Sequence, residues 1–147
     1  MQPIRTLVLL ANEHHARLIA HPGKGGALRQ MAHHSHAEWA DDAVIYADRE
    51  GRMRKGEGPI SGLDRSTSER TQERAHFSAH VLAATGQEWA ADRYDSLVIA
   101  APAKMLGALR HGLPVALASA LHGDLDSDLL HLPLEELGEH LAGLIVL

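Results

Sequence analysis

The most constraining feature of this sequence is the run Ser96–Ala101, which reads Ser-Leu-Val-Ile-Ala-Ala and is followed at once by a proline. A short, continuous apolar run is typical of a β-strand that is covered on both faces. Pro102 suits the first turn of a helix, and Met105, Leu106 and Leu109 follow at helical spacing. A buried strand that leads directly into a helix predicts an α/β architecture.

The N-terminal part of the chain predicts a hairpin and a third strand. Ile4–Ala11 is β-compatible throughout, and the polar turn Asn12–His15 joins it to a second strand over Ala16–Ala20. The glycine-rich stretch His21–Gly26 breaks the pattern, and Leu28–His36 is a further strand candidate. We therefore expect three strands within the first 36 residues.

Two more helices are predicted. Ser66–Glu69 matches a capping box, so a helix should begin near Ser66, and Gly86 is expected to end or weaken it. The buried stripe of that helix should be Phe77, Val81, Ala84 and Trp89. Pro133 should start the last helix, because Glu135 and Glu136 would then lie in its first turn, where the helix dipole favours acids.

These elements predict one domain spanning residues 1–147, built on a mixed sheet with flanking helices and with Ser96–Ala101 as the central strand. A chain of 147 residues can hide roughly 70% of its unfolded surface, enough for one core. Val44–Ala47 is a further short strand candidate, while Pro114–Leu121 is apolar but ambiguous between helix and strand.

The composition excludes several classes of protein. The chain has no cysteine, which rules out disulfides and thiolate-bound metals. No stretch approaches the roughly 20 apolar residues that a membrane span requires, and Leu7–Ala11 is too short for the apolar part of a signal peptide. We therefore expect a cytoplasmic protein without a membrane partner.

Positive charge is concentrated in one segment of an acidic chain. The formal net charge is −5, yet the segment Arg49–Arg74 has seven basic residues against five acidic ones. Within it, Asp48–Leu63 has no regular period and contains four glycines. The candidate RNA-binding residues are Arg49, Arg52, Arg54 and Lys55. They could neutralise phosphates, or they could simply solvate the loop; the lack of aromatic residues argues against reading of base sequence.

The run His33–His36 is the strongest metal candidate in the sequence. On a strand, His34 and His36 would share a face and could offer two nitrogens to zinc. A third ligand would have to come from elsewhere, and the chain has no His-Glu-x-x-His motif, so surface imidazoles are the preferred interpretation. Phosphate-loop and dinucleotide motifs are also absent, and we expect no metal and no cofactor. No serine lies in a nucleophile-elbow context, so a non-catalytic role is favoured.

With these segments in order, the sequence resembles the host-attachment family, bacterial proteins described as required for attachment to host cells. The residues that carry the resemblance are Thr6–Ala11, Ala16–Leu18, Asp48–Arg52, the helix around Phe77, Ala101–Arg110, Asp124–Leu125 and Leu132–Leu137.

That family is in turn similar to the middle domain of the class-one peptide-release factors of archaea and eukaryotes. The similarity implies a mixed sheet with flanking helices and a long loop before the first long helix, which in release factors carries Gly-Gly-Gln. Here Gly25-Gly26 lies far upstream and precedes Ala27, and Gln72 follows Thr71. We therefore expect no release of peptide from peptidyl-tRNA.

Three functions remain open from the sequence. The preferred one is a non-catalytic binding module of the host-attachment family, associated with structured RNA or the ribosome through the basic loop. The second is a protein-interaction or homo-oligomeric module linked to host attachment, for which Pro114–Leu121 could form a contact. The third is a hydrolase of unknown substrate.

Overall fold

The computed structural model describes residues 4–35 and 62–144. Within these ranges the chain forms five strands and four helices. In chain order they are β1 (Thr6–Ala11), β2 (His15–His21), β3 (Arg29–Ser35), α2 (Gly62–Ala91), β4 (Ser96–Ala101), α3 (Ala103–Gly112), α4 (Val115–Ala120), β5 (Leu121–Asp126) and α5 (Leu134–Leu141).

The strands form a single mixed sheet in the order β3-β2-β1-β4-β5. β1 and β2 are antiparallel, as the polar turn predicted, and β2 and β3 are also antiparallel. β1, β4 and β5 run parallel to one another. This arrangement confirms the predicted α/β class with a mixed sheet. The prediction that β4 is the central strand was wrong. β4 is an interior strand, but the middle position of the five belongs to β1, which has β2 on one side and β4 on the other.

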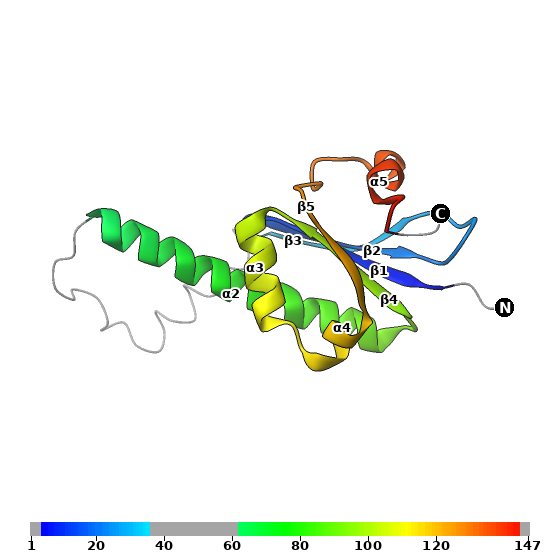
Figure 1. Cartoon of the computed structure of the whole chain (residues 1–147), viewed down its shortest axis with the longest axis horizontal. Coiled ribbons are helices and arrows are strands. Elements are labelled where there is room, and N and C mark those ends of the chain that lie inside the picture. Colours follow the sequence, from blue (N-terminus) through cyan, green and yellow to red (C-terminus); the bar gives the residue numbers. More distant parts are fainter. Residues whose placement is uncertain (1–3, 36–61, 145–147) are drawn as a thin grey trace.

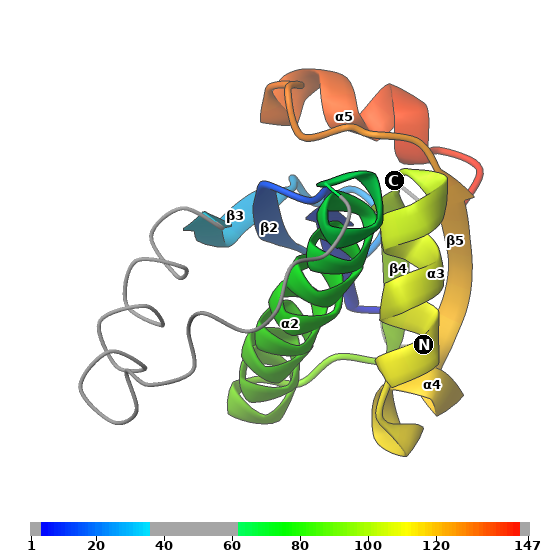
Figure 2. The ribbon, with the colours of Figure 1, turned by 90° about the vertical axis from the view of Figure 1, so that its left-hand side faces the viewer.

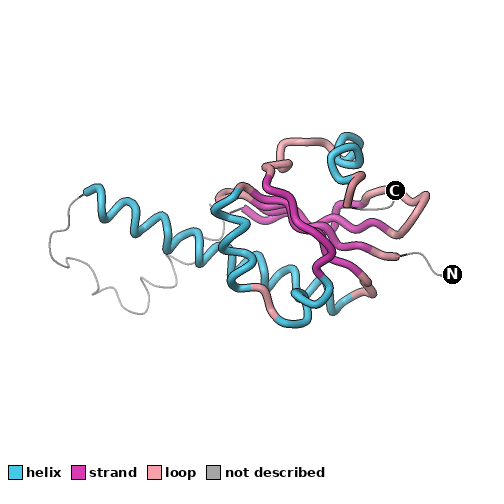
Figure 3. Tube along the Cα trace, in the orientation of Figure 1, coloured by secondary structure: helices cyan, strands magenta, loops and turns pink. Residues whose placement is uncertain are grey.

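Helices cover both faces of the sheet (Figures 1 and 3), and the alternation of side chains along β1 divides the core between them. Leu7 and Leu9 point to the face covered by α2, α3 and α4, where Phe77 is completely buried. Val8 and Leu10 point to the opposite face, where they pack with Leu137 and Leu141 of α5. The apolar strands are therefore continuous in sequence because each of them is buried on both sides.

α2 is longer at both ends than the sequence suggested. It begins at Gly62, so Ser66 lies inside the helix and the capping box does not mark its start. It continues through Gly86 to Ala91, because Val81 and Thr85 are buried in the turn before and hold the helix on the sheet. A glycine costs only about 1 kcal/mol in a helix, less than this burial contributes. The first turns whose side chains are described are exposed, and Figure 1 shows them extending beyond the sheet.

The ambiguous segment Pro114–Leu121 contains the whole of one short helix and the first residue of a strand. Pro114 caps the short helix α4, and the chain then enters β5 at Leu121. Sequence analysis missed β5, since its polar residues and half-buried pattern are those of an edge strand that pairs only with β4. The helix starts at Pro102 and Pro133 are confirmed, each proline serving as the N-cap. Val44–Ala47 lies outside the described residues.

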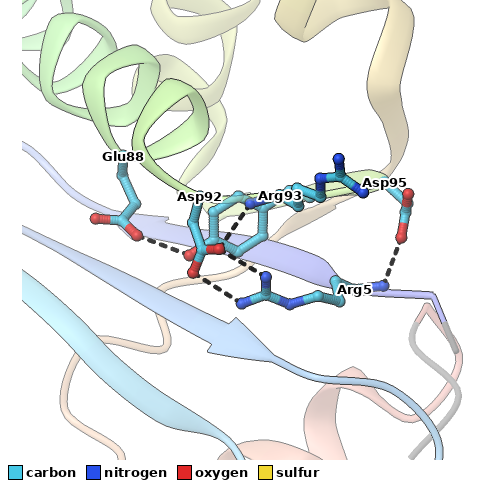
Figure 4. A network of polar contacts seen from close by, with 6 residues as sticks. Arg5, Glu88, Asp92, Arg93 and Asp95 are labelled. Carbon is cyan, nitrogen blue, oxygen red and sulfur yellow. Dashed lines mark hydrogen bonds and ion pairs between the residues drawn. The ribbon is translucent and has the colours of Figure 1, made fainter.

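A network of polar contacts ties β1 to the segment before β4, at the edge where both strands begin (Figure 4). The Arg5 guanidinium donates two hydrogen bonds to the Asp92 carboxylate, at 2.8 and 3.0 Å, and lies 5.0 Å from the centre of the Tyr94 ring. The Tyr94 hydroxyl donates to Glu88, and the Arg5 backbone N–H donates to Asp95. Burial, followed by the bond to Glu88, raises the pKa of Tyr94. These contacts hold the start of β1 against the segment that precedes β4.

The Asp92 pairing makes a testable contribution to acid stability. Its hydrogen bonds from Arg5 and then from the Arg93 backbone lower the pKa of Asp92 to about 2. In an unfolded chain an aspartate titrates near 3.9, so the stabilisation is present above about pH 4 and is lost as the pH falls toward 2. We expect the difference in melting temperature between the wild type and Asp92→Asn to shrink over that interval, as measured by thermal unfolding followed by circular dichroism. Asp126→Asn, at an exposed carboxylate, is the control; an identical pH profile for both variants would contradict the assignment.

Candidate functional site

The carboxyl ends of the parallel strands β1, β4 and β5 lie at one edge of the sheet. In open α/β sheets, ligands bind preferentially outside this edge. β3 has the same direction as β1 and therefore also ends at this edge, which Figure 2 shows from the front. The polar side chains that follow β1 and β5 therefore lie where a ligand-binding site is expected.

Asn12, directly after β1, organises the β1–β2 turn. Its side-chain oxygen accepts hydrogen bonds from the backbone N–H groups of His14 and His15, both at 2.8 Å. Its side-chain nitrogen donates to Asp128 Oδ2 at 3.0 Å, while Asp128 Oδ1 accepts from the Leu130 backbone N–H. One side chain thus joins the β1–β2 turn to the loop that follows β5.

Two imidazoles on neighbouring strands form a pair beside this turn. His15 Nδ1 and His33 Nε2 are 3.3 Å apart, and the two ring planes are inclined by only 14°. Both residues are exposed. The pair shares one hydrogen, and the tautomers determine which ring donates it.

Arg17 lies on β2 next to this pair and is half-buried. Its guanidinium donates to the Gln30 side-chain oxygen at 2.8 Å and to the carbonyls of Leu130 and Leu132 at 3.1 and 2.7 Å. All three acceptors are neutral, and burial lowers the pKa of Arg17. In the part of the chain that the structure describes, no carboxylate forms a salt bridge with this cation. Within the described residues its positive charge is fixed in place without being neutralised.

A cavity of about 350 Å³ lies among these groups, open to solvent. Its lining residues are Asn12, His15, Arg17, His33, Asp128, Leu130 and His131. Polar side chains from the β1–β2 turn, β2 and β3 thus line one cavity together with the β5–α5 loop. We call it the carboxyl-edge cavity.

On the opposite face of the sheet, α2 makes its own polar contacts near this edge. Arg74 pairs with Glu13 of the β1–β2 turn at 2.6 Å. The His80 ring meets the edge of the His34 ring at a centroid distance of 5.4 Å. Burial, and to a smaller extent the neighbouring His34, lower the pKa of His80. His80 is therefore a packing residue that favours its neutral form.

The predicted site residues are only partly placed by the structure. Arg49, Arg52, Arg54 and Lys55 lie outside the described residues, as does His36. His34 is on β3, where it packs against His80 and points away from the carboxyl-edge cavity's lining. Within residues 4–35 and 62–144, no three histidine, aspartate or glutamate side chains are arranged to hold a metal ion.

Sequence reasoning did not identify the carboxyl-edge cavity, although two signals were present. Arg17 is the one charged residue within the otherwise apolar run Ala16–Ala20, and a charge at such a position needs a specific reason. His15 and His33 each belong to a histidine doublet, but only the antiparallel register, which pairs Arg17 with His33, brings them together.

The position of Gln72 bears on peptide release. Gln72 is exposed and lies well inside α2, ten residues after the helix begins. A glutamine there has the regular helical backbone on both sides, whereas the release-factor tripeptide needs two glycines before the glutamine. The described residues therefore offer no counterpart of that tripeptide.

Comparison with known proteins gives a family for nearly the whole chain. Residues 5–141 match a family model described as Bacterial archaeo-eukaryotic release factor family 12. Among curated proteins, no significant match was found. The resemblance to the host-attachment family stays a prediction. None of the helices in the described ranges combines the length and the apolar character of a membrane span.

Proposed function

The chain belongs to family 12 of the bacterial archaeo-eukaryotic release factors, and on this premise we propose that it is a cytoplasmic, non-catalytic module that binds structured RNA or the ribosome. The proposed contacts are Arg49, Arg52, Arg54 and Lys55. In the sequence they lie between β3, which ends at the carboxyl edge of the sheet, and α2.

The observation that carries this proposal is the charge at that edge. Among the described residues Arg17 is held there by neutral acceptors alone, and the imidazoles of His15 and His33 can add positive charge on protonation. Four further basic residues follow β3 in the sequence, on a chain whose net charge is −5. An acidic protein can bind a polyanion only through a local patch of this kind.

A protein-interaction or homo-oligomeric module linked to host attachment is the second candidate. The Val115 side chain on α4 is 82% exposed, which is unusual for a large apolar residue. An apolar groove of about 400 Å³ lies nearby between α2 and α3, with Leu82, Ala108 and Pro114 in its lining. A hydrolase is the third candidate, and no feature of the described residues favours it.

The RNA proposal predicts binding that depends on salt. If four phosphates of a single-stranded region are contacted, the slope of log affinity against log salt should be about −3. Arg52→Ala/Arg54→Ala should reduce that slope by about one to two and weaken binding to every RNA alike, because phosphate contacts carry no sequence information. The measurement is fluorescence anisotropy with structured RNAs between about 50 and 200 mM salt, together with co-sedimentation with ribosomes.

The matched control is Lys24→Ala/Arg93→Ala, which also removes two charges but at exposed positions on the other edge of the sheet. It should leave the slope nearly unchanged. RNA binding that is unchanged in the Arg52→Ala/Arg54→Ala variant, or that cannot be detected at about 50 mM salt, would reject the proposal and favour the protein-interaction candidate.

A further inference from the structure

We propose that the carboxyl-edge cavity is a binding site for a single phosphate group, with Arg17 as its fixed cation and His15 and His33 as adjacent donors. This site is separate from the basic segment, and its existence does not depend on the proposed association with RNA. The shared chemistry is the phosphate itself, whether it belongs to inorganic phosphate, to a nucleotide or to an RNA chain.

The Arg17 guanidinium uses only part of its hydrogen-bonding capacity among the described residues. Its Nε–H and both hydrogens of one terminal nitrogen serve the three bonds to Gln30, Leu130 and Leu132. The other terminal nitrogen has no hydrogen bond within residues 4–35 and 62–144. Burial disfavours the charged form of this side chain, and the attraction of an anion bound there would offset that cost. Guanidinium groups bind phosphate oxygens in strong, charge-assisted hydrogen bonds.

The His15–His33 pair offers a free N–H donor in either of its tautomeric arrangements. A neutral imidazole has one N–H, so the ring that accepts the shared hydrogen bond must have its own N–H on its other nitrogen. Either tautomeric arrangement of His15 and His33 therefore offers at least one free donor direction, and protonation adds a second. His131 lines the same cavity from the β5–α5 loop. The lining thus includes side chains able to donate hydrogen bonds from β2, β3 and the β5–α5 loop, which suits a tetrahedral oxyanion.

Asp128 is the one acidic residue in the described lining of the cavity. Both of its oxygens already accept hydrogen bonds, from the Asn12 side chain and from the Leu130 backbone. Its charge is therefore partly compensated, and it serves to fix the loop that presents His131 and the carbonyls bound by Arg17. A cavity of about 350 Å³ is large enough for a phosphate together with the group to which it is esterified.

The test is titration of the full chain with inorganic phosphate, and separately with adenosine monophosphate, followed by NMR of the histidine ring protons near pH 6.5 at constant ionic strength. We expect the signals of His15 and His33 to shift and saturate, and those of His76 and His122 to stay in place. Arg17→Gln should weaken binding roughly tenfold or more, since it removes a charged hydrogen-bond partner. Arg29→Gln, at an exposed residue on the far end of β3, is the matched control.

If Arg17→Gln does not fold, His33→Ala provides a second test of the site. His33 is exposed on an edge strand, so its truncation should leave the fold intact. It should also weaken phosphate binding. No saturable shift at His15 and His33 of the wild type, or an unchanged dissociation constant for phosphate, followed at His15, in His33→Ala, would overturn the proposal. The Arg52→Ala/Arg54→Ala variant separates the two hypotheses: it should bind RNA more weakly while it keeps the phosphate-induced shifts.

Discussion

Phe77→Ala should lower the free energy of unfolding by about 3–5 kcal/mol, the largest effect we expect from any single truncation in this chain. Phe77 is the only phenylalanine, it is completely buried, and it joins α2 to the face of the sheet formed by Leu7, Leu9 and Leu18. Its removal would leave a cavity that a stiff sheet cannot close. Urea unfolding followed by circular dichroism measures the change.

Val115→Ala is the control for this variant, because Val115 is 82% exposed and its truncation should change the free energy of unfolding by less than about 0.5 kcal/mol. A cost below about 1 kcal/mol for Phe77→Ala would mean that α2 does not rest on the sheet through this side chain.

Leu137→Ala should cost about 2–5 kcal/mol through the opposite face of the sheet. Leu137 and Leu141 are the two completely buried residues of α5, and they cover Val8, Leu10 and Val98. Because α5 has only eight residues, it depends on this packing and not on its own helical propensity. Amide hydrogen exchange should therefore accelerate in α5 far more than in α2, while urea unfolding reports the overall loss.

Glu139→Ala on the exposed face of the same helix is the matched control and should have little effect on either measurement. Equal acceleration of exchange in α2 and α5 would show instead that the two faces of the sheet unfold as one unit.

The elements that could be predicted from sequence are those whose residues are buried on both faces or bounded by prolines. β1 and β4 are continuous apolar runs, and Pro102 and Pro133 stand at helix starts as expected. β5 could not be predicted, because an edge strand with the sequence Leu-His-Gly-Asp-Leu-Asp has neither a continuous apolar run nor a clean alternation. Its strand conformation comes from pairing with β4.

The candidate site was harder to predict than the fold for a related reason. The Asn12–Asp128 hydrogen bond joins residues 116 positions apart, and Arg17 reaches carbonyls more than 110 positions away. No local pattern encodes such contacts; they exist only once β1, β2 and the loop after β5 share one edge. Histidine doublets were visible in the sequence, but the strand register selected His15 and His33 from them.

The middle position of β1 has a consequence for how the protein is made on the ribosome. β1 can pair with β2 as soon as the first hairpin has emerged, but its other side pairs with β4, in which Ser96 lies opposite Thr6. During the synthesis of some 75 intervening residues, at about 5–20 residues per second, the backbone N–H and C=O groups along that edge of β1 have no native partner. The nascent hairpin is thus an open template for pairing with other chains over several seconds, and we expect it to be the stage at which a chaperone is most needed.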